Sequence, residues 1–164
     1  SGNGADRIDL SESVQSQDTV KLNTSSIDFG IDTIYGFLQG ASGDIFDVSA
    51  VLSPSFEIFP LVALGSAPNA NFSGGILRLL GSDLSISTDL FNAFQVGGGF
   101  ETLSIENGAS ALIVSANSQS TGEDQHLFFA EQNVEEMSVT QLATLQGNAL
   151  DIDQWHVDNF SFIA

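Results

Sequence analysis

The feature that most constrains the fold of this chain is a weak repeat in its first 50 residues. In each copy an acidic residue is followed by a spacer and then by an apolar residue that favours strands. The copies recur at steps of 12, 14 and 12 residues, at Asp6-Arg7-Ile8, Asp18-Thr19-Val20, Asp32-Thr33-Ile34 and Asp44-Ile45-Phe46. Because each short strand must be followed by a turn of similar length, this spacing predicts a coiling or meandering β structure.

The excess of acidic over basic residues limits the kinds of molecule that the chain could bind. Asp and Glu number 21 against 3 for Lys and Arg, which gives a formal charge of -18. Without clustered Lys and Arg the chain cannot displace counterions from a phosphate backbone, so nucleic acid is excluded and an anionic membrane surface is disfavoured. Ca²⁺, a hard cation held by carboxylates and carbonyls, is the natural complement, and an acidic solubilising surface is the alternative. The absence of Cys excludes disulfides and thiolate metal sites.

Beyond residue 50 the pattern predicts more strands and one or two short helices. Residues 51–64 are apolar but carry two prolines, which favours a connection or an edge. Alternation predicts strands near 75–80, 84–87 and 100–105 and a hairpin with arms at 111–115 and 127–130. Capping residues and helical spacing predict helices at 90–94, after a cap at 87–89, and at 138–145. The pattern of residues 155–164 predicts a terminal strand that is docked in the sheet, with a bulge or bend near 158–159.

No stretch reaches the ~18 to 20 apolar residues of a membrane span, so no membrane insertion is expected.

Two segments carry a recognisable motif. Residues Ser1 to Asp9 fit the nonapeptide G-G-x-G-x-D-x-U-x, with Ser in place of the first Gly. In such a repeat the glycines let backbone carbonyls and the Asp carboxylate face one Ca²⁺, while the apolar residue, here Ile8, points inward. Further on, Gly30-Ile31-Asp32-Thr33-Ile34-Tyr35-Gly36 precedes Gly43-Asp44-Ile45-Phe46-Asp47-Val48-Ser49. Together the segments resemble the end of the repeat array in RTX (hemolysin-type calcium-binding repeat) proteins that carry a type I secretion target domain.

The resemblance implies an all-β fold. Residues 1–50 would form a short RTX-like β-roll or meander, and residues 51–164 a β-sandwich-like cap that includes the secretion target. The implied cofactor is Ca²⁺, held by Gly2, Gly4, Asp6, Asp9, Gly30, Asp32, Asp44 and Asp47. Asp also favours turns, where its carboxylate accepts hydrogen bonds from nearby backbone, so turn capping is the alternative for Asp6, Asp32 and Asp44.

The resemblance also implies a location and a partner. We expect a larger bacterial parent, exported without cleavage by type I secretion machinery that engages the C-terminal end, and therefore a secreted or cell-surface protein. Calcium outside the cell would then drive folding, because the ion relieves repulsion among carboxylates and couples binding to folding. The activity of the parent would reside upstream, and no enzymatic activity is expected of this chain.

Two other functions compete with this interpretation. A self-associating or adhesive surface module would use the Phe-rich apolar content to pack on another copy or on a cell-surface partner. A small hydrolase is the weaker alternative, because no nucleophile and base are visible at a motif spacing. The acidic pairs Glu135-Glu136 and Asp151-Asp153 are expected by chance among 21 acids. His126 and His156 are expected to be structural or surface residues, since neither belongs to a zinc-type pair.

Overall fold

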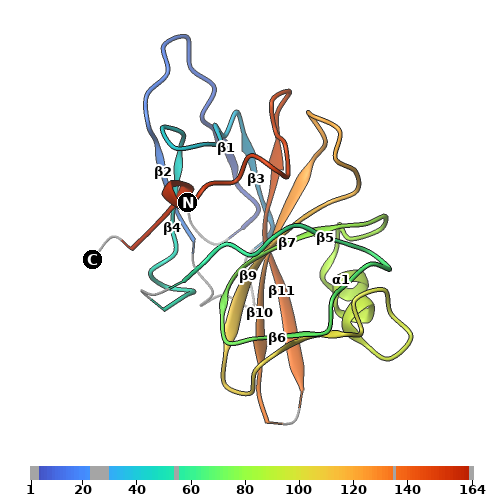
Figure 1. Cartoon of the computed structure of the whole chain (residues 1–164). Helices are drawn as coiled ribbons and strands as arrows, with labels where there is room; N and C mark the ends of the chain where they lie inside the picture. The colour runs from blue at the N-terminus through green and yellow to red at the C-terminus, as the bar shows by residue number, and fades with distance from the viewer. Residues whose placement is uncertain (1–3, 23–29, 54–55, 135, 163–164) are drawn as a thin grey trace.

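The computed structural model describes residues 4–22, 30–53, 56–134 and 136–162 (Figure 1). Within these ranges the chain is mostly strand, which confirms the all-β expectation, and it contains one α-helix and one turn of 3-10 helix. The elements are β1 Arg7–Asp9, β2 Thr19–Lys21, β3 Asp32–Tyr35, β4 Ile45–Asp47, β5 Val62–Ala63, β6 Ala70–Phe72, β7 Gly75–Leu80, α1 Ser87–Phe94, β8 Leu103–Ile105, β9 Ser110–Ala116, β10 Gln125–Gln132, β11 Met137–Gln146, η1 Val157–Asn159 and β12 Phe160–Ser161.

The four copies of the sequence repeat become β1 to β4, and they form a parallel coil. β1 pairs with β3 in one sheet, and β2 pairs with β4 in a second sheet, so the chain alternates between the sheets. One strand in each sheet makes what we call a rung, and equivalent positions in the two rungs are 26 residues apart. This interval is not a multiple of nine, so these two rungs are not a plain stack of nonapeptides.

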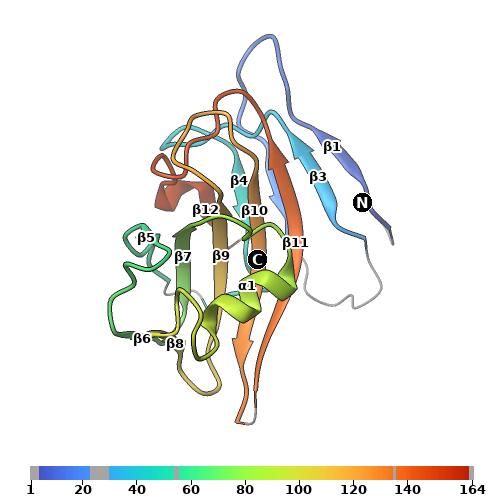
Figure 2. The same ribbon diagram turned by 90° about the vertical axis from the view of Figure 1, so that its right-hand side faces the viewer.

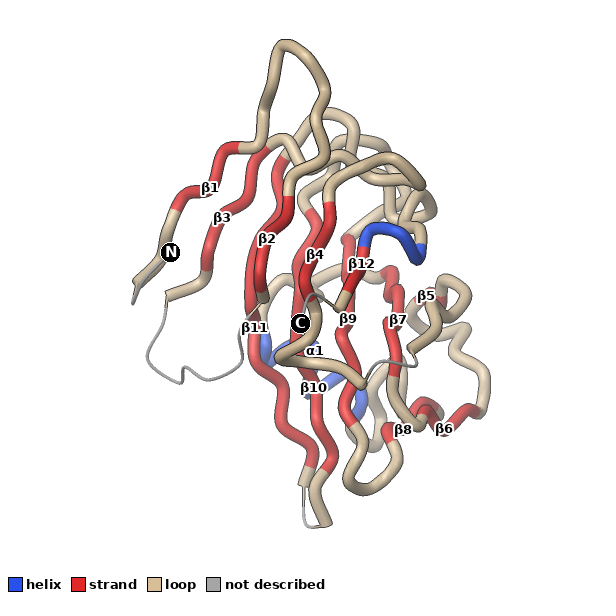
Figure 3. Tube along the Cα trace, turned by 90° about the vertical axis from the view of Figure 1, so that its left-hand side faces the viewer, coloured by secondary structure: helices blue, strands red, loops and turns tan. Residues whose placement is uncertain are grey.

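The end of the chain supplies a third rung. β11 pairs in parallel with β3, and β12 pairs in parallel with β4. The two sheets therefore have the orders β1-β3-β11-β10-β9-β7-β5 and β12-β4-β2, and Figure 3 shows the second sheet lying in front of the first. The division at residue 50 stays a prediction, although β11 and β12 extend both sheets of the N-terminal coil.

Strands β7, β9 and β10 are buried on both faces. Along β9, Leu112 and Val114 point to the core between the two sheets, while Ala111 and Ile113 point to a second core on the opposite face. Helix α1 covers that opposite face, as Figure 2 shows, through Leu90 and two further buried residues of its inner side. Strands covered on both faces read as continuous apolar runs rather than as alternation.

The expected hairpin is present, since β9 and β10 pair antiparallel with Leu127 opposite Val114. The expected helix at 138–145 is wrong, because these residues lie in β11, which pairs antiparallel with β10. The register shifts between Leu127, opposite Ala143, and Phe128, opposite Gln141, so Leu142 is an extra residue in the strand. A β-bulge of this kind breaks the period of two and leaves apolar residues at intervals that imitate a helix.

The structure also differs from the sequence-based prediction around α1 and β8. No strand forms at 84–87, because α1 already begins at Ser87. The helix is preceded by Ile86 as N-cap without a side-chain cap hydrogen bond, so the cap expected at 87–89 is wrong. The strand expected at 100–105 is limited to β8, which pairs in parallel with β6.

The terminal segment is docked and bent, as predicted. The bend is the 3-10 turn η1 at Val157–Asn159, directly before β12. Trp155 and Phe160 are 5% and 4% exposed, and both belong to the core between the sheets. Val157 is 47% exposed, so it takes no part in the docking. The last two residues lie outside the described part of the chain.

Candidate functional site

The aspartates of the repeat are arranged as a ladder between rungs. Asp32 Oδ1 accepts a hydrogen bond from the backbone N–H of Asp6 at 2.9 Å, and Asp44 Oδ1 accepts one from the backbone N–H of Asp18 at 3.0 Å. In both pairs the carboxylate caps the residue at the equivalent position of the preceding rung, 26 residues earlier. Asp44 is 1% exposed, and its Oδ2 accepts a further hydrogen bond from the backbone N–H of Leu38 at 2.8 Å.

Asp47 and Asp9 cap backbone locally. Asp47 Oδ1 accepts from the backbone N–H of Ser49 at 3.0 Å, and its Oδ2 lies 3.9 Å from the Lys21 ammonium. Asp9 accepts from the backbone N–H of Ser11 at 3.1 Å. Hydrogen bonds from Ser11 lower the pKa of Asp9 below its usual value, and the Arg7 guanidinium, 3.5 Å away, adds a smaller effect in the same direction. The Asp9 carboxylate is therefore stabilised in the charged form.

The glycines of the expected site play backbone roles. Gly4 has a φ of 138°, a backbone conformation that residues with a side chain rarely adopt. A Cβ at Gly30 would overlap the backbone of Ala5, so the rungs approach closely there. Gly2 lies outside the described residues.

The described residues include no cluster of metal-ligating side chains. Within the ranges that the structure covers, no group of three or more acidic or His side chains is positioned to hold a metal ion. The ladder hydrogen bonds turn Asp32 and Asp44 toward backbone N–H donors of the preceding rung, and only Asp44 also caps a nearby turn, through the N–H of Leu38. Because the first three residues of the nonapeptide lie outside the described part, the assignment of the eight residues as calcium ligands stays a prediction.

A buried asparagine that the sequence did not single out fastens the chain end to the coil. Asn159 is fully buried, and its Nδ2 donates to the backbone carbonyls of Leu38 at 3.4 Å, Gly40 at 3.1 Å and Asp44 at 2.9 Å. Its Oδ1 accepts from the backbone N–H groups of Gly40 at 2.9 Å and His156 at 3.1 Å. No sequence signal could have found this residue, because its partners before β4 are 115 to 121 positions away.

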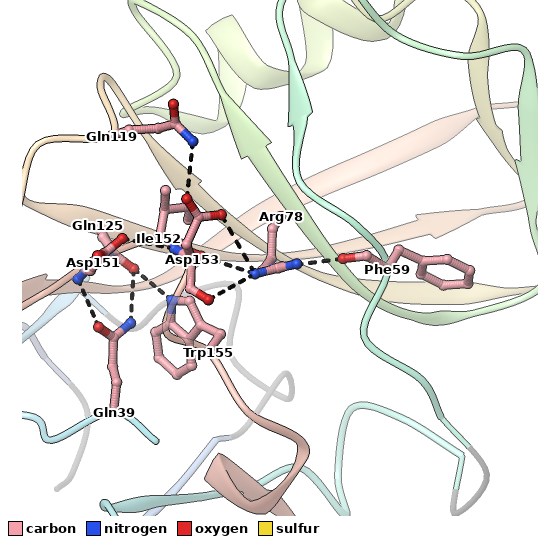
Figure 4. Close-up of polar contacts among 9 residues, drawn as sticks. All are labelled: Gln39, Phe59, Arg78, Gln119, Gln125, Asp151, Ile152, Asp153 and Trp155. Carbon is pink, nitrogen blue, oxygen red and sulfur yellow. Dashed lines mark hydrogen bonds and ion pairs between the residues drawn. The ribbon is translucent and has the colours of Figure 1, made fainter. Parts of the chain in front are cut away.

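A second polar cluster, shown in Figure 4, joins the coil to the cap. Gln125 is 1% exposed, and its Oε1 accepts from Trp155 Nε1 at 2.6 Å and from Gln39 Nε2 at 3.5 Å. Gln39 in turn accepts from the backbone N–H of Asp151 at 2.7 Å. The cluster orients Trp155, whose ring lies 5.4 Å from that of Phe37 and belongs to the aromatic core.

Arg78 on β7 anchors the loop before Trp155 to the cap. Its guanidinium is 15% exposed and donates to the carbonyls of Phe59, Ile152 and Asp153 at 3.2 to 3.3 Å. The Asp153 carboxylate also accepts from Gln119 at 3.0 Å. Because Asp153 serves these contacts and Asp151 Oδ1 accepts from the backbone N–H of Asp153 at 2.9 Å, this acidic pair has a structural role.

One hollow in the cap bears on the hydrolase alternative. It has a volume of about 570 Å³, and its lining includes Glu57, Glu106, Asn107 and Phe56. Both glutamates are exposed to solvent. The general acid of a glycosidase is typically held in an apolar, water-excluded environment, and the exposed positions of these two side chains do not provide one.

Comparison with other proteins adds no relative. The chain matches no protein-family model, and no curated protein or solved structure was found to resemble it significantly. In the described part of the chain, no helix is long and apolar enough to cross a membrane.

Proposed function

We propose that this chain is the calcium-stabilised terminal cap of a longer β-coil protein that acts outside the cell, and that its role is structural rather than catalytic. The observation that carries the proposal is the architecture of the coil. On one side of the coil the two sheets end at β1 and β2, which belong to the periodic repeat. On the other side the larger sheet continues into the strands of the cap. Capping units of repeat proteins cover the exposed end of a stack in this way.

Calcium enters the proposal through charge and motif. A net charge of -18 destabilises the folded state, because like charges repel one another in the compact chain. A divalent cation that binds only the folded chain would reduce this repulsion. The nonapeptide places Gly4 and Asp6 directly before β1, in the rung at the open end of the coil. Export by type I machinery, with a secreted or cell-surface destination, follows from the resemblance and is part of the same proposal.

Thermal unfolding with and without calcium tests the proposal. At a Ca²⁺ concentration of about 100 times Kd, binding stabilises the fold by about 2.7 kcal/mol, which raises Tm by roughly 5 to 10 °C in a chain of this size. Mg²⁺ at the same concentration is the control for general screening of charge. A Tm that excess chelator leaves unchanged would contradict the calcium part of the proposal.

Calorimetric titration of two variants locates the ion. Asp6→Asn should weaken Ca²⁺ binding, because it removes a charged ligand while its own backbone N–H keeps the hydrogen bond to Asp32. Asp83→Asn removes the same charge from an exposed loop outside the nonapeptide, and Asn tolerates its φ of 63°. Equal affinity in the two variants would remove Asp6 from the proposed site.

Export has a separate test. Deleting residues 155–164 should abolish both secretion by type I machinery and stable folding, because the segment contains the buried Trp155 and Phe160. A truncated chain that is still exported would place the export signal elsewhere. A second candidate function is a self-associating or adhesive module. It is favoured by the outer edges of β1 and β2, beyond which no strand lies among the residues that the structure describes. Sedimentation separates the two functions, since a strict monomer with and without Ca²⁺ argues against self-association.

A further inference from the structure

The open end of the coil repeats the geometry of the rung beneath it. Ile8 lies opposite Ile34 in the larger sheet, and Val20 lies opposite Phe46 in the smaller sheet. Figure 3 shows β1 and β2 at the same side of their sheets, and in the described part of the chain no strand lies beyond either. Both edges therefore face the same direction and can be covered together.

The backbone groups on this end are arranged for parallel pairing. Thr33 donates to the carbonyl of Asp6, and Leu10 donates to the carbonyl of Tyr35, so the intervening residues Arg7 and Asp9 direct their backbone groups away from β3. In the second sheet, Ile45 donates to the carbonyl of Asp18 and Leu22 donates to the carbonyl of Asp47. By the same alternation Thr19 and Lys21 direct their backbone groups away from β4.

Asp18 stands at the end of the carboxylate ladder. It occupies the position that Asp44 occupies one rung lower, where the carboxylate accepts a backbone hydrogen bond from the preceding rung. Among the residues that the structure describes, none donates a hydrogen bond to the Asp18 carboxylate, although the residue is half-buried. Partial burial raises the pKa of Asp18, and Glu12 and Asp44 raise it further. A donor from an additional rung would satisfy this group.

We propose that β1, β2 and the Asp18 carboxylate form a docking surface for one more 26-residue rung of the same kind, which pairs in parallel with both strands and donates a backbone N–H to Asp18. The inference rests on the proposed function, and it names the partner that the cap receives. A second copy of this chain is a poorer occupant. A symmetric contact would bring the same edges and both Asp18 carboxylates together in two molecules that each carry a charge of -18.

Duplication of the existing rung tests the docking surface directly. A second copy of residues 5–30 is inserted between Gly30 and Ile31, which places an outer rung 26 residues before an inner rung. We expect hydrogen exchange of the amides at Arg7, Asp9, Thr19 and Lys21 in the inner copy to slow by at least about tenfold relative to the same amides in the parent chain. An insert of the same composition in shuffled order is the control and should give no protection.

Asp18 provides an internal comparison in the duplicated protein. Asp18→Ala in the inner copy should lower Tm, because it removes an acceptor from a paired rung. The same substitution in the outer copy should leave Tm almost unchanged, because that carboxylate lies at the free edge. Equal effects of the two substitutions, or equal protection by the ordered and shuffled inserts, would overturn the proposal.

A measurement on the unmodified chain covers the case in which neither insertion folds. A synthetic peptide of residues 5–30 at millimolar concentration should shift the amide resonances of β1 and β2, and the absence of shifts would count against docking. Protection of these amides that rises with protein concentration would assign the edge to a second copy and overturn the inference. A Tm that is independent of calcium would refute the calcium part of the proposed function and leave rung docking standing, so the two failures are distinguishable.

Discussion

Replacement of Asn159 by Ala should destabilise the fold by about 3 to 5 kcal/mol. The side chain is fully buried and contacts five backbone groups. Its Oδ1 accepts from two N–H groups, and the two hydrogens of its Nδ2 are shared among three carbonyls. Removing it takes one hydrogen-bond partner from each of these backbone groups. The carbonyls of Leu38 and Gly40 keep a backbone donor, and each group that stays unsatisfied costs about 1 to 3 kcal/mol. Local relaxation will restore some of them, which limits the total to the stated range.

Urea unfolding followed by the fluorescence of Trp155, the single tryptophan, measures this loss. Circular dichroism on the same samples checks that the probe reports global unfolding. Asn117→Ala is the matched control, since Asn117 is exposed and should change stability by no more than about 0.5 kcal/mol. A loss below about 1 kcal/mol for Asn159→Ala would refute the argument that this residue fastens the chain end.

Asn159→Asp sharpens the test. The oxygen that replaces Nδ2 would face the carbonyls of Leu38, Gly40 and Asp44, so burial and repulsion raise the pKa of the new carboxyl. Below about pH 4 the group is protonated in both folded and unfolded states, and the difference in stability from the parent is smallest. As pH rises above that value the unfolded chain ionises first and the difference grows. A difference that does not change with pH would contradict this reasoning.

Three further predictions concern other parts of the fold. Arg78→Met should cost about 2 to 4 kcal/mol in urea unfolding, because a side chain only 15% exposed loses its hydrogen bonds to three carbonyls. Arg7→Met, at a side chain 65% exposed, should cost less than about 1 kcal/mol. Gly36→Ala should lower Tm more than Gly108→Ala, because both have φ near 80° but only the first Cβ would overlap the turn after β1; equal shifts would contradict this. Burial lowers the pKa of His126, and Asp124 opposes this only in part. The imidazole of the unfolded chain therefore binds a proton more tightly than that of the folded chain, and the stability of the fold should decrease as the pH drops below about 6.5. His126→Gln should flatten that part of the plot of stability against pH.

The strands of the coil could be predicted because their signal is local. An Asp, a spacer and an apolar residue recur at each of β1 to β4, and an antiparallel hairpin is equally visible in the apolar runs of β9 and β10. The helix predicted at 138–145 failed for a physical reason, since the bulge at Leu142 gives a strand the apolar spacing of a helix. Local patterns of this kind can be misread whenever pairing with a neighbour decides the conformation.

The candidate site was predictable only in part. Calcium binding and turn capping were the two roles that the sequence left open for Asp32 and Asp44. Their hydrogen bonds to the preceding rung, 26 residues earlier, correspond to neither role, and only Asp44 also caps a nearby N–H group. The sequence did not single out Asp18, although this residue belongs to the same repeat, because its significance depends on which side of the coil is open. The role of Asn159 depends on a contact across 115 residues and is invisible to any short motif.

The third rung has a consequence for how the chain folds. Phe46 is completely buried, and the rings that stack around it include Trp155 and Phe160 from the end of the chain. Closing a loop of more than 100 residues costs entropy before any apolar contact rewards it, and chains rich in such distant contacts fold slowly. The core of the two N-terminal rungs is therefore incomplete until Trp155 and Phe160 have packed on Phe46. While residues 155–161 are still held in a ribosome or a narrow channel, the preceding chain should therefore stay open and sensitive to proteases, and it should close in one late, cooperative step.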